Sequence, residues 1–158
     1  MAAGLVAVVS GLLDALTRFL VPLPEELQAA ALVSPISMTV IQLFSIVLIS
    51  VVMYRAGRVF GGYGDLTGAF KATIWLSLVG LVFSMVTIIL MTVSSGLAQM
   101  FQLVSILWML AIFTVFVQAL HGFGSFFTTL AGVLGTIFAV ATVIVIALSM
   151  FGFLPGTT

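Results

Sequence analysis

The chain has 158 residues, of which 63% are hydrophobic and only 5% are charged, and its formal net charge is zero. A soluble domain of this size needs far more polar surface, so the composition indicates an integral membrane protein. Four basic residues cannot form a nucleic-acid surface, and a sequence without cysteine has no disulfide, thiolate chemistry or cysteine metal site.

The hydrocarbon core of a bilayer is about 30 Å thick, and each helical crossing takes about 20 residues. The apolar runs therefore predict an all-α, polytopic membrane helical bundle, with a single transmembrane domain over residues 1–158 and no soluble domain. Five transmembrane helices are expected, at about residues 2–21, 36–54, 69–93, 100–120 and 126–153.

The first expected helix carries both an acid and a base. Asp14 and Arg18 lie four residues apart, so they can form an ion pair on one helix face. A charge near the bilayer centre is costly, so we expect this intramembrane ion pair to lie near a membrane boundary and to stabilise the helix. No Lys or Arg precedes the first apolar run, so residues 2–21 are interpreted as a mature helix and not as a cleaved signal peptide.

Charge, glycine and aromatic residues gather in one place, the stretch 54–71 around the connection between the second and third expected helices. Short loops rich in Lys and Arg stay in the cytoplasm, so Arg55, Arg58 and Lys71 place this loop, and with it the amino terminus, on the cytoplasmic side. The lipid bilayer is an expected partner, with these cations near anionic lipid head groups. The candidate interaction residues of this loop are Arg55, Gly57, Arg58, Gly61, Gly62, Tyr63, Gly64, Asp65 and Lys71.

A less polar version of this loop returns before the fifth expected helix, and counting crossings puts it on the same side of the membrane. An offset of about 60 residues aligns 41–46 with 101–106 and, without a gap, 62–64 with 122–124. Two repeated helical hairpins would produce this match, and so would chance among apolar residues. The candidate interaction residues of the second loop are His121, Gly122, Phe123 and Gly124.

Short motifs in and around the two loops carry a family resemblance. They are Gly57-Arg58, Gly61-Gly62-Tyr63-Gly64, Lys71-Ala72-Thr73-Ile74-Trp75, Trp108 and Leu120-His121-Gly122-Phe123. Over about residues 14–142 the chain resembles a bacterial member of the Yip1 family, whose eukaryotic relatives act in vesicle traffic with Rab GTPases. The resemblance implies a five-helix membrane fold and its topology, and it implies no defined activity for the bacterial branch.

The segment Gly62-Tyr63-Gly64-Asp65 also resembles the Gly-x-Gly-Asp signature of intramembrane aspartyl proteases. Such a protease needs two carboxylates that share one proton at bilayer depth. The other aspartate, Asp14, lacks the preceding tyrosine, and Asp65 is better explained as an N-cap at a helix start. His121 is the lone histidine, with no nearby carboxylate or thiol to complete a metal site or a triad. We therefore predict no enzyme activity, no catalytic residue, no metal and no cofactor.

The function that this pattern favours is a non-enzymatic scaffold or interaction protein of the bacterial inner membrane, in membrane organisation or a trafficking-like role. Its expected partners are other membrane proteins or further copies of itself. One alternative is a small accessory or assembly subunit of a larger membrane complex. Another is a minimal transporter, for which Gln42, Gln102 and Gln118 are the notable intramembrane polar residues.

Overall fold

The computed structural model describes residues 3–4, 6–11 and 35–150. Four long helices follow one another in the main described range: α3 (Pro35–Val59), α4 (Leu66–Val93), α5 (Ser95–His121) and α6 (Phe126–Met150). Residues 3–4 and 6–11 are also helical, whereas the rest of the expected first span, with Asp14 and Arg18, lies outside the described residues. The predicted all-α class is thus confirmed for the described residues, and the count of five spans stays a prediction.

All four helices are long and apolar enough to cross a membrane, with α3 qualifying from Thr39 onward. Within each span at most 22% of the residues are buried inside the molecule. The remaining apolar side chains need a nonpolar solvent around them, which water cannot supply. The chain is therefore an integral membrane protein.

The first loop is much shorter than the sequence predicts. Helix α3 continues to Val59 and α4 already begins at Leu66, so Arg55, Gly57 and Arg58 are helical residues of α3 and Lys71 is a residue of α4. Arginine and alanine are good helix formers, and a single glycine inside a helix costs only about 1 kcal/mol, so the basic stretch does not end α3. The predicted boundary at residue 54 is therefore wrong by about one helical turn.

A Schellman motif ends α3 at Gly61, whose φ is +82°. The N–H of Gly62 donates to the carbonyl of Gly57 at 2.8 Å, and the N–H of Gly61 donates to that of Arg58 at 3.1 Å. Helix α5 ends similarly at Gly122, with a φ of +71°, and there Phe123 N–H donates to the carbonyl of Gln118 at 3.1 Å. These are the positions where glycine is favoured because its φ is positive.

The ends of α3 and α5 can be compared with the alignment that the predicted repeat requires. The ungapped alignment pairs Gly62 with Gly122, but the glycines with the same backbone role are Gly61 and Gly122. The structure thus does not support the residue-by-residue pairing of the two loops. Duplication of a helical hairpin stays a prediction.

Helices α4 and α5 form a tight antiparallel hairpin, joined by Ser94 alone. Ser94 has an extended backbone, its N–H donates to the carbonyl of Leu90 at 2.8 Å, and its own carbonyl accepts the N–H of Ala98 at 3.1 Å. One residue therefore ends α4 and begins α5, and the expected start of this span at residue 100 is five residues late.

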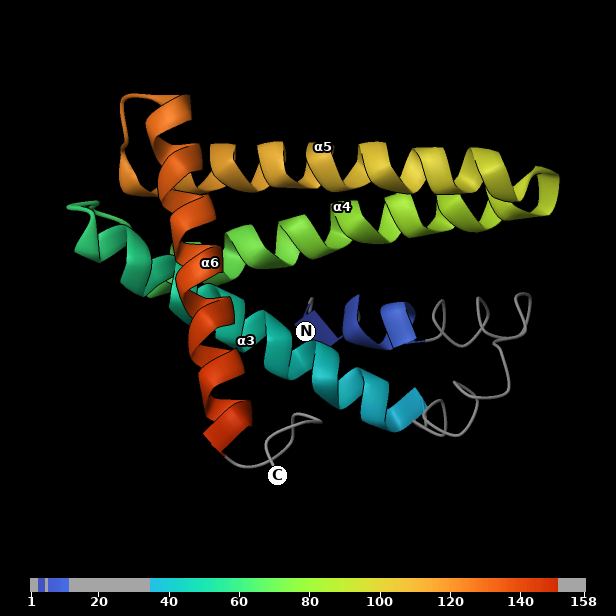
Figure 1. Cartoon of the computed structure of the whole chain (residues 1–158), viewed down its shortest axis with the longest axis horizontal. Coiled ribbons are helices and arrows are strands. Elements are labelled where there is room, and N and C mark those ends of the chain that lie inside the picture. Colours follow the sequence, from blue (N-terminus) through green and yellow to red (C-terminus); the bar gives the residue numbers. More distant parts are fainter. Residues whose placement is uncertain (1–2, 5, 12–34, 151–158) are drawn as a thin grey trace.

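The other two helices are attached to this hairpin differently. Helix α3 packs against α4, and α6 packs against α5 but runs across the hairpin instead of along it (Figure 1). The small buried core lies near the α3–α4 and α5–α6 loops, and it consists of Met53, Ala69, Val117 and Val133. Because α6 runs across the hairpin, the four helices do not form one uniform bundle (Figure 1).

Candidate functional site

The two loops meet at His121, the last residue of α5. Its side chain is only 1% exposed, although it is polar and lies at a helix end. A buried imidazole needs hydrogen-bond partners for both ring nitrogens, and the chain supplies them from two other segments.

The hydrogen bonds of His121 join α5 to α3 and to the α3–α4 loop. Its Nδ1 accepts the N–H of Gly64 at 3.2 Å, and its Nε2 lies 3.2 Å from the carbonyl oxygen of Met53. Its backbone carbonyl accepts the N–H of Tyr63 at 3.2 Å. Because Gly64 can only donate and the Met53 carbonyl can only accept, both ring bonds require the neutral tautomer with its proton on Nε2.

Glycines surround the imidazole because there is no room for larger residues. A Cβ at Gly57 would overlap the His121 ring, and one at Gly62 or Gly64 would lie 2.5 Å and 2.7 Å from it. A Cβ at Gly68 would lie 2.5 Å from Leu120, the residue before the histidine. We call Gly57, Gly62, Gly64 and His121 the histidine clamp.

The aromatic residues of the two loops have different surroundings. The ring of Phe123 stacks on His121, with centroids 5.6 Å apart and planes 21° apart. Tyr63 is instead 86% exposed. The aromatic positions that the sequence alignment equates are therefore an internal packing residue and a surface residue.

The charged residues lie around the clamp and outside it. Arg55, Arg58 and Lys71 are all exposed. Asp65 is the N-cap of α4, as the sequence predicts, and its carboxylate accepts the N–H of Gly68 at 3.1 Å. It is also the only carboxylate side chain in the described residues, so the proton-sharing pair of an aspartyl protease is not seen there.

The remaining predicted residues, Gly61, Gly122 and Gly124, are exposed positions in the turns. No group of three or more His, Cys, Asp or Glu side chains in the described ranges could hold a metal ion. The loop end as a whole is a set of hydrogen-bonded turns around one histidine, with cations and Tyr63 at its surface.

Sequence reasoning did not single out the positions of a set of hydroxyls buried inside the helices. They donate to the carbonyls four residues earlier in the chain, at 2.7–2.9 Å, and they belong to Ser50, Thr73, Thr114 and Thr129. Ser105 differs, since its buried Oγ has no hydrogen-bond partner among the described residues. No spacing pattern in the sequence marks these positions, because a hydroxyl can satisfy itself on its own helix.

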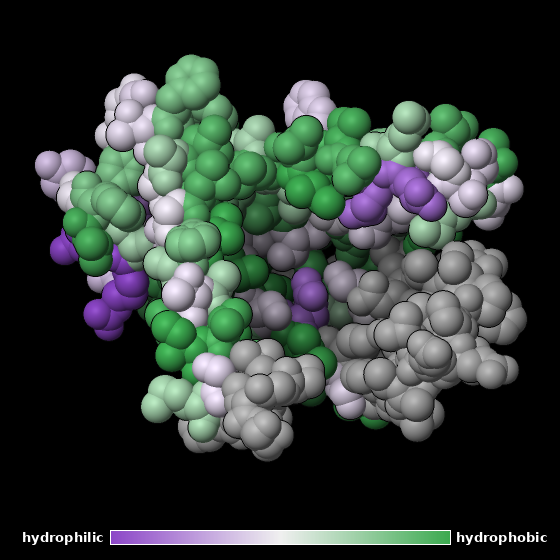
Figure 2. Space-filling view, viewed as in Figure 1, coloured by the Kyte–Doolittle hydropathy of each residue, from purple (hydrophilic) through white to green (hydrophobic). Residues whose placement is uncertain are grey.

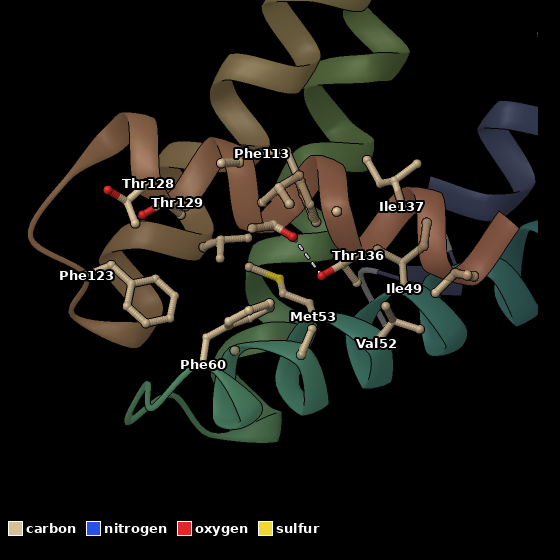
Figure 3. Close-up of a pocket in the computed structure, with 18 of the residues that line it drawn as sticks. Ile49, Val52, Met53, Phe60, Phe113, Phe123, Thr128, Thr129, Thr136 and Ile137 are labelled. Atoms are coloured by element: carbon tan, nitrogen blue, oxygen red, sulfur yellow. Dashed lines mark hydrogen bonds between the residues drawn. The ribbon is translucent and has the colours of Figure 1, made fainter. Parts of the chain in front are cut away.

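Two cavities open between the helices. The larger, about 1070 Å³, is an apolar groove between α3 and α6 that begins at the loop end (Figure 3). The smaller, about 320 Å³, lies beside α4 and is partly polar, with Ser10, Gln42, Thr73, Ser77 and Ser84 in its lining. The predicted residue Gln42 thus lines a cavity, whereas Gln102 lies 3.4 Å from the hydroxyl of Thr87 across the α4–α5 hairpin.

Comparison of the chain with protein-family models, with curated proteins and with solved structures gives no match. The class of the protein is defined by its own fold and site: it is a polytopic helical membrane protein in which the histidine clamp holds the two loops together.

Proposed function

We propose that the protein is a non-enzymatic scaffold that binds another membrane protein through its loop end. The observation that supports this most is that the backbone of the α3–α4 loop is held in place by His121 while Tyr63, in the same loop, is exposed. The clamp holds the α3–α4 loop because the backbone N–H groups of Gly64 and Tyr63 donate hydrogen bonds to His121, while Tyr63 remains 86% exposed.

A tyrosine and an arginine that are both exposed at the loop end are well suited to protein recognition. Tyrosine and arginine are enriched among residues that dominate binding energy, and a rigid loop loses little entropy when a partner binds. Tyr63 and Arg58 both lie on this surface, and neither is needed to fill the clamp. The resemblance to the Yip1 family favours the same kind of role, in the inner membrane of a bacterium with the loops in the cytoplasm.

The test is capture of a partner by photocrosslinking in intact cells from the exposed position 66, next to this loop, followed by mass spectrometry. We expect a defined crosslinked protein whose yield falls at least about tenfold in Tyr63→Ala with Arg58→Ala, since hot-spot truncations cost about 2 kcal/mol or more. Ala139→Leu, an exposed change on α6, is the matched control. Unchanged capture in the double variant would contradict the proposal, and capture of a fixed multi-subunit complex would favour the accessory-subunit alternative.

The smaller cavity supports a second candidate function, that of a minimal transporter. The α4 residues Thr73, Ser77 and Ser84 share one helix face, and with Gln42 they give this cavity polar groups within the spans. Intramembrane polar groups of this kind often line solute pathways. Flux of small polar solutes into liposomes, abolished by Gln42→Leu and retained in Gln118→Leu, would support transport; no flux in the wild type would exclude it.

A further inference from the structure

We propose that the groove between α3 and α6 binds one anionic phospholipid, with an acyl chain along the groove and the phosphate at Arg55. This site is separate from the surface of Tyr63 and Arg58, and the proposal does not depend on the scaffold function.

The walls of the groove have the chemistry of a lipid chain. On α3 they include Ile49, Met53 and Phe60, and on α6 they include Gly132 and Ile137 (Figure 3). Hydrophobic surface also covers much of α6 in the space-filling view (Figure 2). The groove opens between two helices that are long and apolar enough to span a membrane, so it faces the acyl region of the bilayer and is in contact with lipid chains.

The length of the groove suits an extended acyl chain. Its α6 wall runs from Thr128 to Ile144, which is about 24 Å at 1.5 Å per residue. The groove is open along one side, so an acyl chain of the surrounding bilayer can lie along this wall.

Arg55 supplies the charge at the loop end of the groove. Leu48 and Val52 line the groove, and Arg55 follows them on the same stripe of α3 at the i, i+4, i+7 spacing. Its exposed guanidinium can therefore reach the groove edge. On the α6 side, Ser125 and Thr128 add hydroxyls to the lining at the same end.

The charge balance at this end favours an anionic head group. Three cations, Arg55, Arg58 and Lys71, lie there with one carboxylate, Asp65, which is already bonded to Gly68. Hydrophilic surface marks the end of α3 near its loop in Figure 2. Arginine binds a phosphate through two parallel N–H groups, so the phosphodiester is the group we assign to Arg55.

The test is native mass spectrometry of the purified full chain exchanged into equal amounts of phosphatidylglycerol and phosphatidylcholine. We expect the wild type to retain one phosphatidylglycerol in preference to phosphatidylcholine. Arg55→Gln should reduce that preference about fivefold, as expected for one basic residue near an anionic head group. Lys71→Gln makes the same charge change on α4, outside the groove lining, and should reduce the preference less than Arg55→Gln does.

A second pair of variants tests the groove itself. A Cβ added at Gly135 meets nothing within 4 Å, so Gly135→Leu should fold and fill the groove, and retention of both lipids should fall. Ala139→Leu adds a similar apolar side chain at an exposed position outside the groove lining, and this variant should retain lipid normally. A phospholipid with a photoreactive acyl chain should label residues 128–144 of the wild type.

Three results would overturn the proposal. They are a lipid preference unchanged in Arg55→Gln, retention unchanged in Gly135→Leu, and labelling confined to α4 and α5. A dimer in the wild type that Gly135→Leu dissociates would identify a second copy as the occupant and would also exclude the lipid.

Discussion

At the scale of single residues, one histidine explains why several glycines stand where they do. His121 is buried with both ring nitrogens bonded, and a Cβ on Gly57 would overlap its ring. The sequence marks these glycines as a cluster and predicts that they belong to an interaction loop. Only the fold reveals that Gly57 and Gly64, on separate segments, contact the same imidazole.

The clamp can be tested by a double-mutant cycle. His121→Ala removes two ring hydrogen bonds and leaves a cavity, and it should lower the free energy of unfolding by about 2–4 kcal/mol. Gly57→Ala should cost about 1–3 kcal/mol through overlap with the ring. The double variant should be more stable than the sum of the two losses predicts, because alanine at 57 meets no ring once position 121 is alanine.

Thermal unfolding in detergent, followed by the fluorescence of Trp75 and Trp108, measures these effects. Gly124→Ala is the control, since a Cβ there meets nothing within 4 Å, and its effect should stay within about 0.5 kcal/mol. Additive losses in the double variant would show that the ring and Gly57 are not in contact.

A different residue, Ser105, gives a prediction of opposite sign. Its hydroxyl is buried without a hydrogen-bond partner in the described part of the chain, which costs free energy in the folded state. Ser105→Ala should leave stability unchanged or raise it by up to about 1 kcal/mol. The buried and self-bonded Thr114 serves as a comparison, because Thr114→Ala should destabilise. A clear loss in Ser105→Ala would mean that the hydroxyl has a partner in the membrane.

At the scale of the helices, the sequence predicts the existence of the elements better than their ends. Hydrophobic runs locate α3 to α6, because a helix that spans a membrane must be apolar over about 20 residues. Their ends are set by backbone hydrogen bonds at Gly61, Ser94 and Gly122, which hydropathy does not report. The glycine-rich segment therefore looked like a long loop, although α3 continues through its first third and α4 begins before its end.

The beginning of α4 gives a test at this scale. Asp65→Ala removes the side-chain acceptor for the Gly68 N–H and should cost about 1 kcal/mol of stability, whereas Asp65→Asn should keep most of it. The same variants separate a cap from a catalytic acid. If Asp65→Asn abolished a proteolytic activity while its thermal unfolding was unchanged, the capping role would not be sufficient.

At the scale of the whole molecule, the loop end and the Ser94 end lie at opposite ends of the α4–α5 hairpin (Figure 1). The clamp holds the loops after α3 and α5 together, so both must emerge from the same face of the membrane. Hydropathy and the distribution of cations predicted this arrangement of the loops. They could not predict that α6 crosses the hairpin, because that depends on how the side chains of α5 and α6 pack together.

Accessibility labelling tests the arrangement directly, because the chain has no native cysteine. Single cysteines at the exposed positions Tyr63 and Gly124 should react with a membrane-impermeant maleimide from one side, and a cysteine at Ser95 should react from the other. Labelling of 63 and 124 from opposite sides would be incompatible with the clamp. If the basic residues lie in the cytoplasm, as proposed, 63 and 124 should react only after the cells are opened.

The one-residue connection at Ser94 leaves almost no backbone between α4 and α5 outside a helix. Within residues 66–121, an antibody or a protease therefore meets no loop longer than this single residue. The turns around His121 offer the irregular chain, the cations and the exposed tyrosine at the opposite end of the hairpin. For α3 to α6, we therefore expect contacts with soluble molecules at the turns around His121.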